Sequence, residues 1–417
     1  MMKSLCPSLL ALALAACAPA APEETVQGPS AAVPEAPAVP ASAEAVAAGN
    51  ADFALRLYGE LRNEPGNLFL SPVSLAGAFG PVAAGARGET RTAIDAALGF
   101  PGGAGEGLHP ALGGLLRGVE REREGVALSI ANALWLKHDL PMKPEFLRTG
   151  QQEYGAQVER LDFRQSAASA KRINDWVSGE TRGRIRELIA ADSLDNDTAL
   201  VVTNAVYFLA DWADPFNASG TRDEPFYSPG GIRQIPLMSQ GGHYRYFETD
   251  GFQAIDLPYK DPSLSMTVLL PKARGGLPSL EASLTGAKLR EWLARIDAEN
   301  PRKVYLHLPK LKMEESYNLV DPLRALGMGI AFTNRADFRG IAEADLLISQ
   351  VVQKTFVRID EKGTEAAAAT GVEVELTSAP PAPPPTFRAD HPFFFVLRDK
   401  QSGAILFLGR VVAPERP

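Results

Sequence analysis

The chain is poor in the residues that bind metals or form disulfides. Its 417 residues include two cysteines and five histidines, too few for a disulfide framework, and no Cys/His cluster has the spacing of a zinc site. The sequence also lacks the HExxH pattern of zinc proteases and the GxSxG pattern of α/β-hydrolases. A net charge of -8 leaves no excess of the basic residues that nucleic-acid binding needs. We therefore expect no metal, no cofactor and no nucleic-acid partner.

The remaining composition is typical of a soluble globular protein, with 45% hydrophobic, 22% charged and 8% aromatic residues. By length alone, two or three domains of roughly 150 residues each are expected. Helical periodicity dominates the first half of the chain, and the segment 199–208 (ALVVTNAVYF) indicates a strand buried on both faces. Segments 393–398 and 404–411 flank a turn and indicate a hairpin. This order, without regular βα alternation, predicts an α+β fold.

The N-terminus carries a short apolar run, well below the ~20 residues that a membrane-spanning helix needs. It ends in Leu14-Ala15-Ala16-Cys17, which resembles the bacterial lipobox, where the cysteine after the cleavage site receives a lipid. This resemblance predicts a lipoprotein signal peptide at 1–16 and lipidation at Cys17. The alternative is an ordinary secretory signal in which Cys17 has no role.

Residues 17–48 consist largely of Ala, Pro, Glu and Ser, and no aromatic residue occurs before Phe53. Such a segment cannot bury a core and is typical of an extended tether, so we expect the folded domain at 49–417. With a lipid on Cys17, the protein would be secreted and anchored at a bacterial cell envelope, periplasmic or at the cell surface. Ala18 would favour the outer membrane in a Gram-negative cell, again by resemblance to lipoproteins.

The segment 361–377 (EKGTEAAAATGVEVELT) has two possible interpretations. Its alanines favour a helix, but the even-numbered positions from 364 to 376 are all small or apolar, whereas the charges after Lys362 lie at odd-numbered positions. This alternation is typical of an amphipathic β-strand. Five prolines follow within 380–385, and they favour an extended chain outside any central sheet. The alternative is a surface loop with accidental alternation.

Several sequence motifs, in a fixed order, resemble those of the serpins, a family of loop-inserting protease inhibitors. The match extends over about residues 50–413, and the motifs are specific only in combination. They are NLFLSPVS at 67–74, NDWVSGET at 174–181, TNAVYF at 203–208, ADFRGI at 336–341 and FRADHPF at 387–393.

The resemblance implies one large domain with three β-sheets, eight or nine helices and an exposed reactive-centre loop at about 361–386. In such proteins a target protease attacks the loop and forms an acyl-enzyme. The cleaved loop then inserts into the main sheet as a new strand and distorts the protease. The implied protein is a monomer without enzymatic activity, and its partner is a serine protease, or a papain-like cysteine protease, held in a covalent complex.

The resemblance also assigns parts of the loop. Glu361 marks its base, and inhibitory serpins have small residues at the hinge that follows; these positions are Gly363, Thr364, Ala366, Ala367, Ala368, Ala369 and Thr370. The usual loop length, counted from Glu361, places the reactive bond at Thr377-Ser378, and Leu376 is the alternative residue before the cut. A small or medium apolar residue there implies an elastase-like, chymotrypsin-like or subtilisin-like target.

A polar cluster beneath the main sheet is implied at Ser71, Ser74, Asn204 and Gln353. Serpins commonly have a histidine where this chain has Gln353, and glutamine does not titrate near neutral pH. Trp212 is expected in the core, where it also shapes the opening through which the loop inserts.

Two other functions stay open from the sequence. One is a non-inhibitory lipoprotein that uses the serpin fold for binding or as a chaperone. The other is a hydrolase whose catalytic carboxylates are distant in sequence and leave no local pattern.

Overall fold

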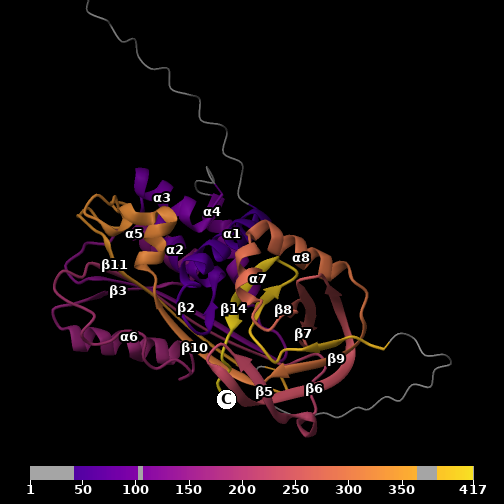
Figure 1. The fold of residues 1–417 in the computed structure, drawn as a ribbon. Coiled ribbons are helices and arrows are strands. Elements are labelled where there is room, and N and C mark those ends of the chain that lie inside the picture. The colour runs from indigo at the N-terminus through magenta and orange to yellow at the C-terminus, as the bar shows by residue number, and fades with distance from the viewer. Residues whose placement is uncertain (1–41, 102–106, 364–382, 417) are drawn as a thin grey trace, which may run out of the picture. The chain divides into compact units, whose positions relative to one another are not determined.

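The centre of the fold is a five-stranded sheet, which we call the main sheet (Figure 1). The computed structural model describes residues 42–101, 107–363 and 383–416. The main sheet contains, in spatial order, β10 (Leu311–Asn318), β11 (Ile348–Ile359), β4 (Leu200–Ala210), β2 (Val126–Lys137) and β3 (Gln157–Leu161). Strand β4 confirms the strand expected at 199–208, and ten of its eleven residues are buried, because both faces of the sheet are covered.

Helices lie on both faces of the main sheet, and α6 lies across the face opposite α2 (Figure 1). Helix α2 (Pro72–Gly85) is almost entirely buried, and proline opens its first turn, where a missing N–H has no cost. Helix α6 (Ser166–Glu180) buries Ile173 and Val177 in a separate cluster around Trp135. The two faces of the sheet therefore belong to two apolar clusters.

The first helix begins earlier than the sequence indicates. Helix α1 (Ala43–Leu61) starts at Ser42, whose side chain accepts a hydrogen bond from the Ala45 amide, and it buries Val46 and Ala47. The expected boundary between tether and domain at 48/49 therefore lies inside this helix. Alanine-rich sequence without aromatic residues looks like a tether, but small side chains also allow a helix to pack closely.

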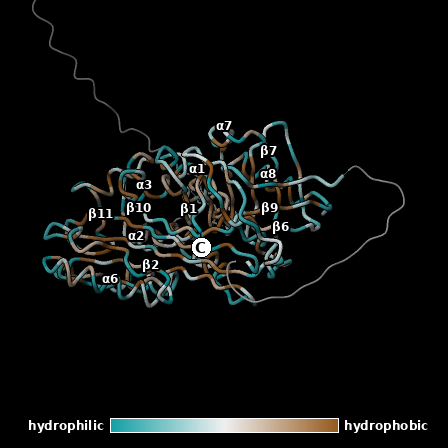
Figure 2. The backbone as a smooth tube through the Cα atoms, turned by 60° about the horizontal axis from the view of Figure 1, so that its bottom comes forward, coloured by the Kyte–Doolittle hydropathy of each residue, from teal (hydrophilic) through white to brown (hydrophobic). Residues whose placement is uncertain are grey.

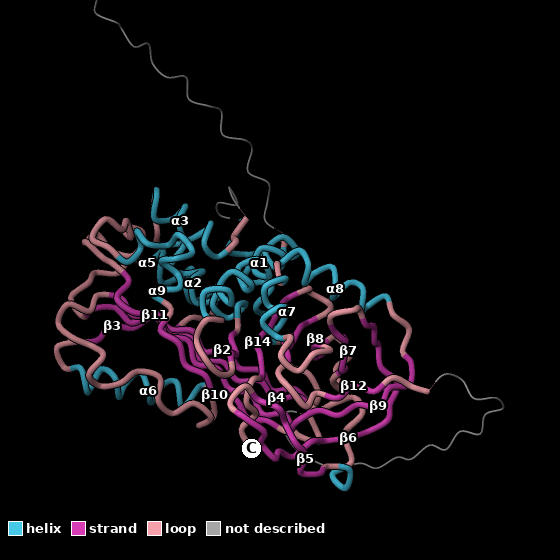
Figure 3. Tube along the Cα trace, in the orientation of Figure 1, coloured by secondary structure: helices cyan, strands magenta, loops and turns pink. Residues whose placement is uncertain are grey.

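The other nine described strands are hydrogen-bonded into one continuous sheet, and the long strand β6 (Gly231–Glu248) belongs to both of its two parts, which we call the second and third sheets (Figure 3). The second sheet has the order β1-β14-β13-β8-β7-β6, and the third contains β5, β6, β9 and β12. The expected hairpin is present as β13 and β14. The bounds of these strands are β1 (Leu68–Leu70), β5 (Arg222–Ser228), β7 (Phe252–Pro258), β8 (Leu264–Pro271), β9 (Arg302–Pro309), β12 (Thr386–Arg388), β13 (Phe393–Asp399) and β14 (Ala404–Val411).

The described residues contain nine α-helices, so the expected α+β fold with three sheets and eight or nine helices is confirmed. The remaining helices are α3 (Gly88–Leu98), α4 (Leu108–Glu120), α5 (Pro144–Tyr154), α7 (Leu277–Ser283), α8 (Gly286–Ala298) and α9 (Val320–Leu323). Short helical turns of other types occur at Ala218–Gly220, Arg324–Met328 and Gly329–Phe332.

A continuous core joins the second and third sheets to the face of the main sheet that α2 covers. Hydrophobic stretches of backbone run along the central strands, and the outer loops are mostly hydrophilic (Figure 2). All described residues belong to one compact unit, Ala38–Pro417, so the expectation of two or three domains from length is wrong. Among the described helices, none combines the length and apolarity needed to cross a membrane, and the described side chains form no cluster suited to a metal ion.

Candidate functional site

The candidate site lies along the seam between β11 and β4, the two central strands of the main sheet. These strands are parallel neighbours, and Gln353 of β11 lies opposite Asn204 of β4. Their outer neighbours, β10 and β2, pair with them antiparallel. Parallel pairs need long crossover connections and are slightly less stable per residue than antiparallel pairs. The seam is therefore the place where a strand of opposite direction could enter and pair antiparallel on both sides.

The chain leaves β11, just before the predicted reactive-centre loop, through a tight turn at Gly363. The Asp360 amide donates to the Gly363 carbonyl (2.8 Å), and the Gly363 amide donates to the Asp360 carbonyl (3.2 Å). Gly363 has a φ of 138°, and a Cβ atom there would lie 2.0 Å from the carbonyl oxygen of Ala210. Only glycine fits this position. The expected hinge glycine therefore lies directly against the end of β4.

The loop base is also fixed to the segment after β4. The amide of Trp212 donates to the Lys362 carbonyl (2.8 Å), and the amide of Phe216 donates to the Glu361 carbonyl (2.6 Å). The Trp212 indole donates to the Asp360 carbonyl (3.1 Å) and stacks on Tyr259, with 4.5 Å between ring centroids. Trp212 is thus both buried in the core and a direct contact of the loop base.

The Glu361 carboxylate is held by two side chains. Lys310 Nζ lies 2.7 Å from it, and the Thr221 hydroxyl donates to it at 2.8 Å. Burial alone would raise the pKa of Glu361, but the hydrogen bonds from Lys310 and Thr221 outweigh burial and hold its pKa below the usual value. The carboxylate is therefore charged at neutral pH.

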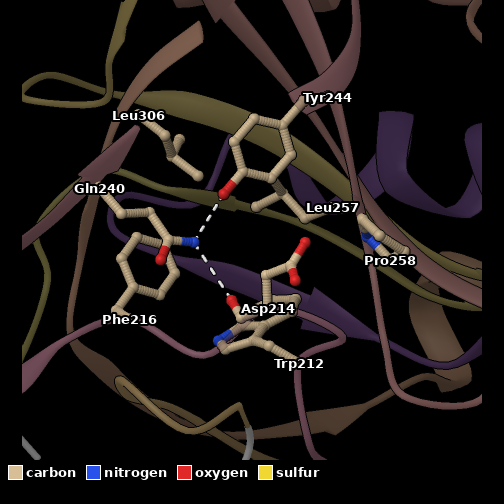
Figure 4. A pocket seen from close by; sticks show the side chains of 8 residues that line it. All are labelled: Trp212, Asp214, Phe216, Gln240, Tyr244, Leu257, Pro258 and Leu306. Carbon is tan, nitrogen blue, oxygen red and sulfur yellow. Dashed lines mark hydrogen bonds between the residues drawn. The ribbon is translucent and has the colours of Figure 1, made fainter. Parts of the chain in front are cut away.

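Beside Trp212 is a small cavity that Figure 4 shows from close by. Gln240 Nε2 donates to the hydroxyl of Tyr244 (2.6 Å) and to the Asp214 carbonyl (3.2 Å), and burial raises the pKa of Tyr244. The cavity volume of about 10 Å³ is about the minimum that admits one water molecule. It is a packing defect behind the loop base and too small for an organic ligand.

The four residues of the expected polar cluster meet in the structure. Gln353 Nε2 donates to Asn204 Oδ1 (2.6 Å), to the Ser71 carbonyl (3.0 Å) and to Ser74 Oγ (3.3 Å), and Gln353 Oε1 accepts from the Ser71 amide (3.2 Å). The Ser74 hydroxyl lies 2.8 Å from Asn204 Oδ1. All four residues are buried. Because Gln353 bonds to Asn204, the cluster ties the two sides of the seam together and ties both to the start of α2.

One member of this cluster, Asn132, was not expected from the sequence. It lies opposite Asn204 on β2, and Asn204 Nδ2 donates to Asn132 Oδ1 (2.6 Å). Three amide side chains therefore cross β11, β4 and β2 at one level of the sheet. The available signal was an amide residue inside the largely apolar run 126–136, whose other polar residue is Ser129, but its partner Asn204 lies in a different strand, far along the chain.

Other expected site residues lie outside the described residues, and their roles stay predictions. They are Cys17, Thr364, Ala366, Ala367, Ala368, Ala369, Thr370, Leu376, Thr377 and Ser378. On the far side of the loop, the described chain resumes before β12, which pairs parallel with β9.

Comparisons with known proteins agree with this geometry. A sequence profile described as Serpin (serine protease inhibitor) matches residues 48–414. The chain belongs to the serpin family.

Individual relatives cover nearly the same part of the chain. Leukocyte elastase inhibitor from Bos taurus is 38% identical over 382 residues, which span 89% of this chain and all of that protein. A highly specific serpin of the insect Tenebrio molitor is 34% identical, with a TM-score of 0.79 over 89% of this chain and 98% of that structure. Human thyroxine-binding globulin is 29% identical, with a TM-score of 0.82 over 90% of this chain and all of that structure.

Proposed function

We propose that this protein is a suicide-substrate inhibitor of serine proteases that traps the acyl-enzyme by inserting its cleaved loop into the main sheet. The parallel seam between β4 and β11, with the loop leaving through the Gly363 turn at its end, carries this proposal. A chain that turns back at Gly363 runs antiparallel to β11, and therefore also to β4. Insertion would replace one parallel pair with two antiparallel pairs.

The chemical step belongs to the protease. The protease serine attacks the carbonyl carbon of Thr377, or of Leu376 in the alternative register, and forms an ester bond as the peptide bond breaks. The new amine, that of Ser378 in the first case, takes the proton that the serine gave up to the protease's general base. Insertion of the freed loop then carries the protease away from the loop base before water can hydrolyse the ester.

The energy for this movement would come from strand formation. The even-numbered face of 364–376 would enter the core side of the sheet, where Val372, Val374 and Leu376 would be buried. With about 1 kcal/mol net for each hydrogen bond and additional apolar burial, insertion would release on the order of 10 kcal/mol, which is comparable with the stability of a whole domain. The closed seam and its polar cluster oppose insertion until the loop is cut.

The target we propose is an elastase-like, chymotrypsin-like or subtilisin-like protease, or a papain-like cysteine protease. Thr377 and Leu376 are small or medium side chains without charge, unlike the Arg or Lys that trypsin-like proteases require. The similarity to leukocyte elastase inhibitor supports this class. We propose that the protein itself acts as a monomer, without catalytic activity or cofactor.

The direct test is incubation with elastase, chymotrypsin and subtilisin, followed by denaturing electrophoresis. A covalent complex that survives SDS is expected with at least one of them, and mass spectrometry of the released C-terminal peptide identifies the reactive bond. Complete cleavage of the loop with full recovery of protease activity would refute inhibition.

We also propose that the protein is a bacterial lipoprotein anchored at the cell envelope through Cys17. The lipobox-like segment and the following Ala/Pro-rich residues 18–42 support this proposal. Expression in a bacterium with labelled fatty acid should label the wild-type chain but not a Cys17→Ser variant. A variant that remains labelled would contradict the proposal.

A second candidate is a non-inhibitory binding or chaperone lipoprotein, because human thyroxine-binding globulin shares this fold and its structure is a complex with thyroxine. This alternative predicts that cleavage of the loop hardly changes the melting temperature. The inhibitor hypothesis predicts a large increase, since the cleaved loop would become a strand of the main sheet.

A further inference from the structure

A cavity of about 700 Å³ opens between the turn after α1 and the start of α7, within the size range of small-molecule sites. None of its lining residues belongs to the loop base or to the polar cluster, so its role is independent of the proposed inhibition. Most of the exposed lining is apolar, contributed by Pro65, Pro229, Leu277, Pro278, Pro392 and Val412.

The floor of this cavity is formed by Glu281 and Arg410, whose side chains already have hydrogen-bond partners within the protein. Arg410 Nη1 lies 3.1 Å from Glu281 Oε1, and the hydroxyl of Tyr58 donates to the same oxygen. Burial and the neighbouring Glu281 raise the pKa of Tyr58 well above its usual value, so the hydroxyl stays a donor at all relevant pH values. Arg410 Nε also donates to the Gly66 carbonyl (2.9 Å). The charges of Arg410 and Glu281 neutralise each other, so these two side chains need no ligand to satisfy them.

The rim of the cavity differs from its floor, because the N–H groups of Arg274 and the Ser228 hydroxyl have no hydrogen-bond partner among the described residues. The guanidinium of Arg274 lies over the ring of Tyr227, 3.3 Å from its centroid, and within the described residues no carboxylate pairs with it. Stacking uses the face of a guanidinium and leaves its N–H edge available. Ser228 Oγ, next in the chain to Tyr227, is buried and has no hydrogen-bond partner in the described structure. Such an orphaned polar atom is costly.

Arg62 adds a second positive charge to the lining, and its side chain donates to the Glu281 carbonyl (3.1 Å). Glu64 is the only lining carboxylate besides the compensated Glu281. The cavity thus combines apolar walls, a net positive charge and unpaired donors at one side.

We propose that this cavity binds a small aromatic carboxylate. The carboxylate would accept a hydrogen bond from Arg274 and, once the half-buried Ser228 side chain rotates about its Cα–Cβ bond to bring its hydroxyl into the cavity, a second one from Ser228. The flat aromatic body would lie against the proline-rich walls. A cation of the same shape would meet the charges of Arg62 and Arg274 and would be excluded.

The test uses isothermal titration calorimetry of the full-length protein with naphthalene-2-carboxylate, and with naphthalen-2-ylmethylammonium as a cation of matched shape. Saturable one-to-one binding is expected for the carboxylate only. Because hydrogen bonds to charged groups contribute about 1.5–3 kcal/mol, Arg274→Gln should weaken binding about tenfold or more. Ser228→Ala should weaken it several-fold. Arg335→Gln removes an arginine whose side chain is 81% exposed, outside the cavity, and should leave the affinity unchanged.

The proposal would be overturned by no saturable binding of the carboxylate, by equal binding of the ammonium compound, or by an affinity that neither Arg274→Gln nor Ser228→Ala changes. Equal weakening by Arg274→Gln and Arg335→Gln would also overturn it, since that result indicates an effect of total charge. Arg274 is exposed, so its variant should fold, and unchanged circular dichroism verifies this.

Discussion

The contribution of Gln353 to keeping the main sheet closed can be measured with the variant Gln353→Met. Methionine has a similar length and is apolar, so it preserves volume but removes the hydrogen bonds to Ser71, Ser74 and Asn204. The buried amide of Ser71 loses its only side-chain acceptor, Gln353 Oε1, and becomes an unsatisfied donor. Asn204 Oδ1 keeps the Ser74 hydroxyl as a neighbour, so the damage is confined to one amide and the cross-seam bond.

The expected loss can be estimated from these bonds. An orphaned buried amide costs about 1–3 kcal/mol and the lost cross-seam bond about 1 kcal/mol, so Gln353→Met should reduce the free energy of unfolding by about 2–4 kcal/mol. For a domain of roughly 370 residues this corresponds to a decrease in melting temperature of about 3–5 °C. The free energy is measured by guanidinium unfolding, and hydrogen exchange locates the effect in β4 and β11.

The matched control is Gln234→Met, which makes the same change at an exposed position of β6 and should alter stability by less than about 0.5 kcal/mol. The reasoning would be refuted if both variants were equally stable. It would also be refuted if Gln353→Met were destabilised without faster exchange along the seam, because the cluster would then not hold the two strands together.

Three further predictions concern the loop base and hinge. Gly363→Ala places a Cβ atom against the Ala210 carbonyl and should cost at least about 1–3 kcal/mol of stability, measured by guanidinium unfolding. Glu361 has a lowered pKa, so its charged form stabilises the fold above the unfolded pKa of about 4.3, and this contribution is lost as pH falls through the lower folded pKa. A Glu361→Gln variant should therefore be less stable than wild type at pH 7, and the difference should shrink as pH falls below about 4.3. Thr364→Arg should convert the inhibitor into a substrate, since insertion would bury an unpaired charge, as measured by the yield of SDS-resistant complex.

Each of these predictions has a contradicting result. A Gly363→Ala variant as stable as wild type would mean that the turn tolerates a side chain. A stability difference between wild type and Glu361→Gln that is equal at pH 7 and pH 3 would assign the effect to packing. An unchanged complex yield for Thr364→Arg would refute the assignment of even-numbered positions to the buried face.

The sequence by itself determined the fold class, the family and several local elements. The apolar run at 199–208, rich in β-branched residues, indicated a buried strand, and the hairpin near the C-terminus follows from two apolar segments around a turn. These features are local, because a periodic pattern or a turn residue acts within a few positions. The same local reasoning assigned residues 43–48, which form the first turns of α1, to the tether, since alanine-rich sequence suits both a helix and a tether.

Only the tertiary structure decided which side chains meet. Asn132 joins the polar cluster because β2 pairs with β4 in one particular register, and the requirement for glycine at 363 comes from the carbonyl of Ala210, far away in the chain. The cavity beside Arg274 is formed by segments that are distant in sequence, with Arg62, Tyr227 and Arg410 all in its lining. Contacts of this kind depend on strand register and on packing between sheets, and no pattern within a single segment contains that information.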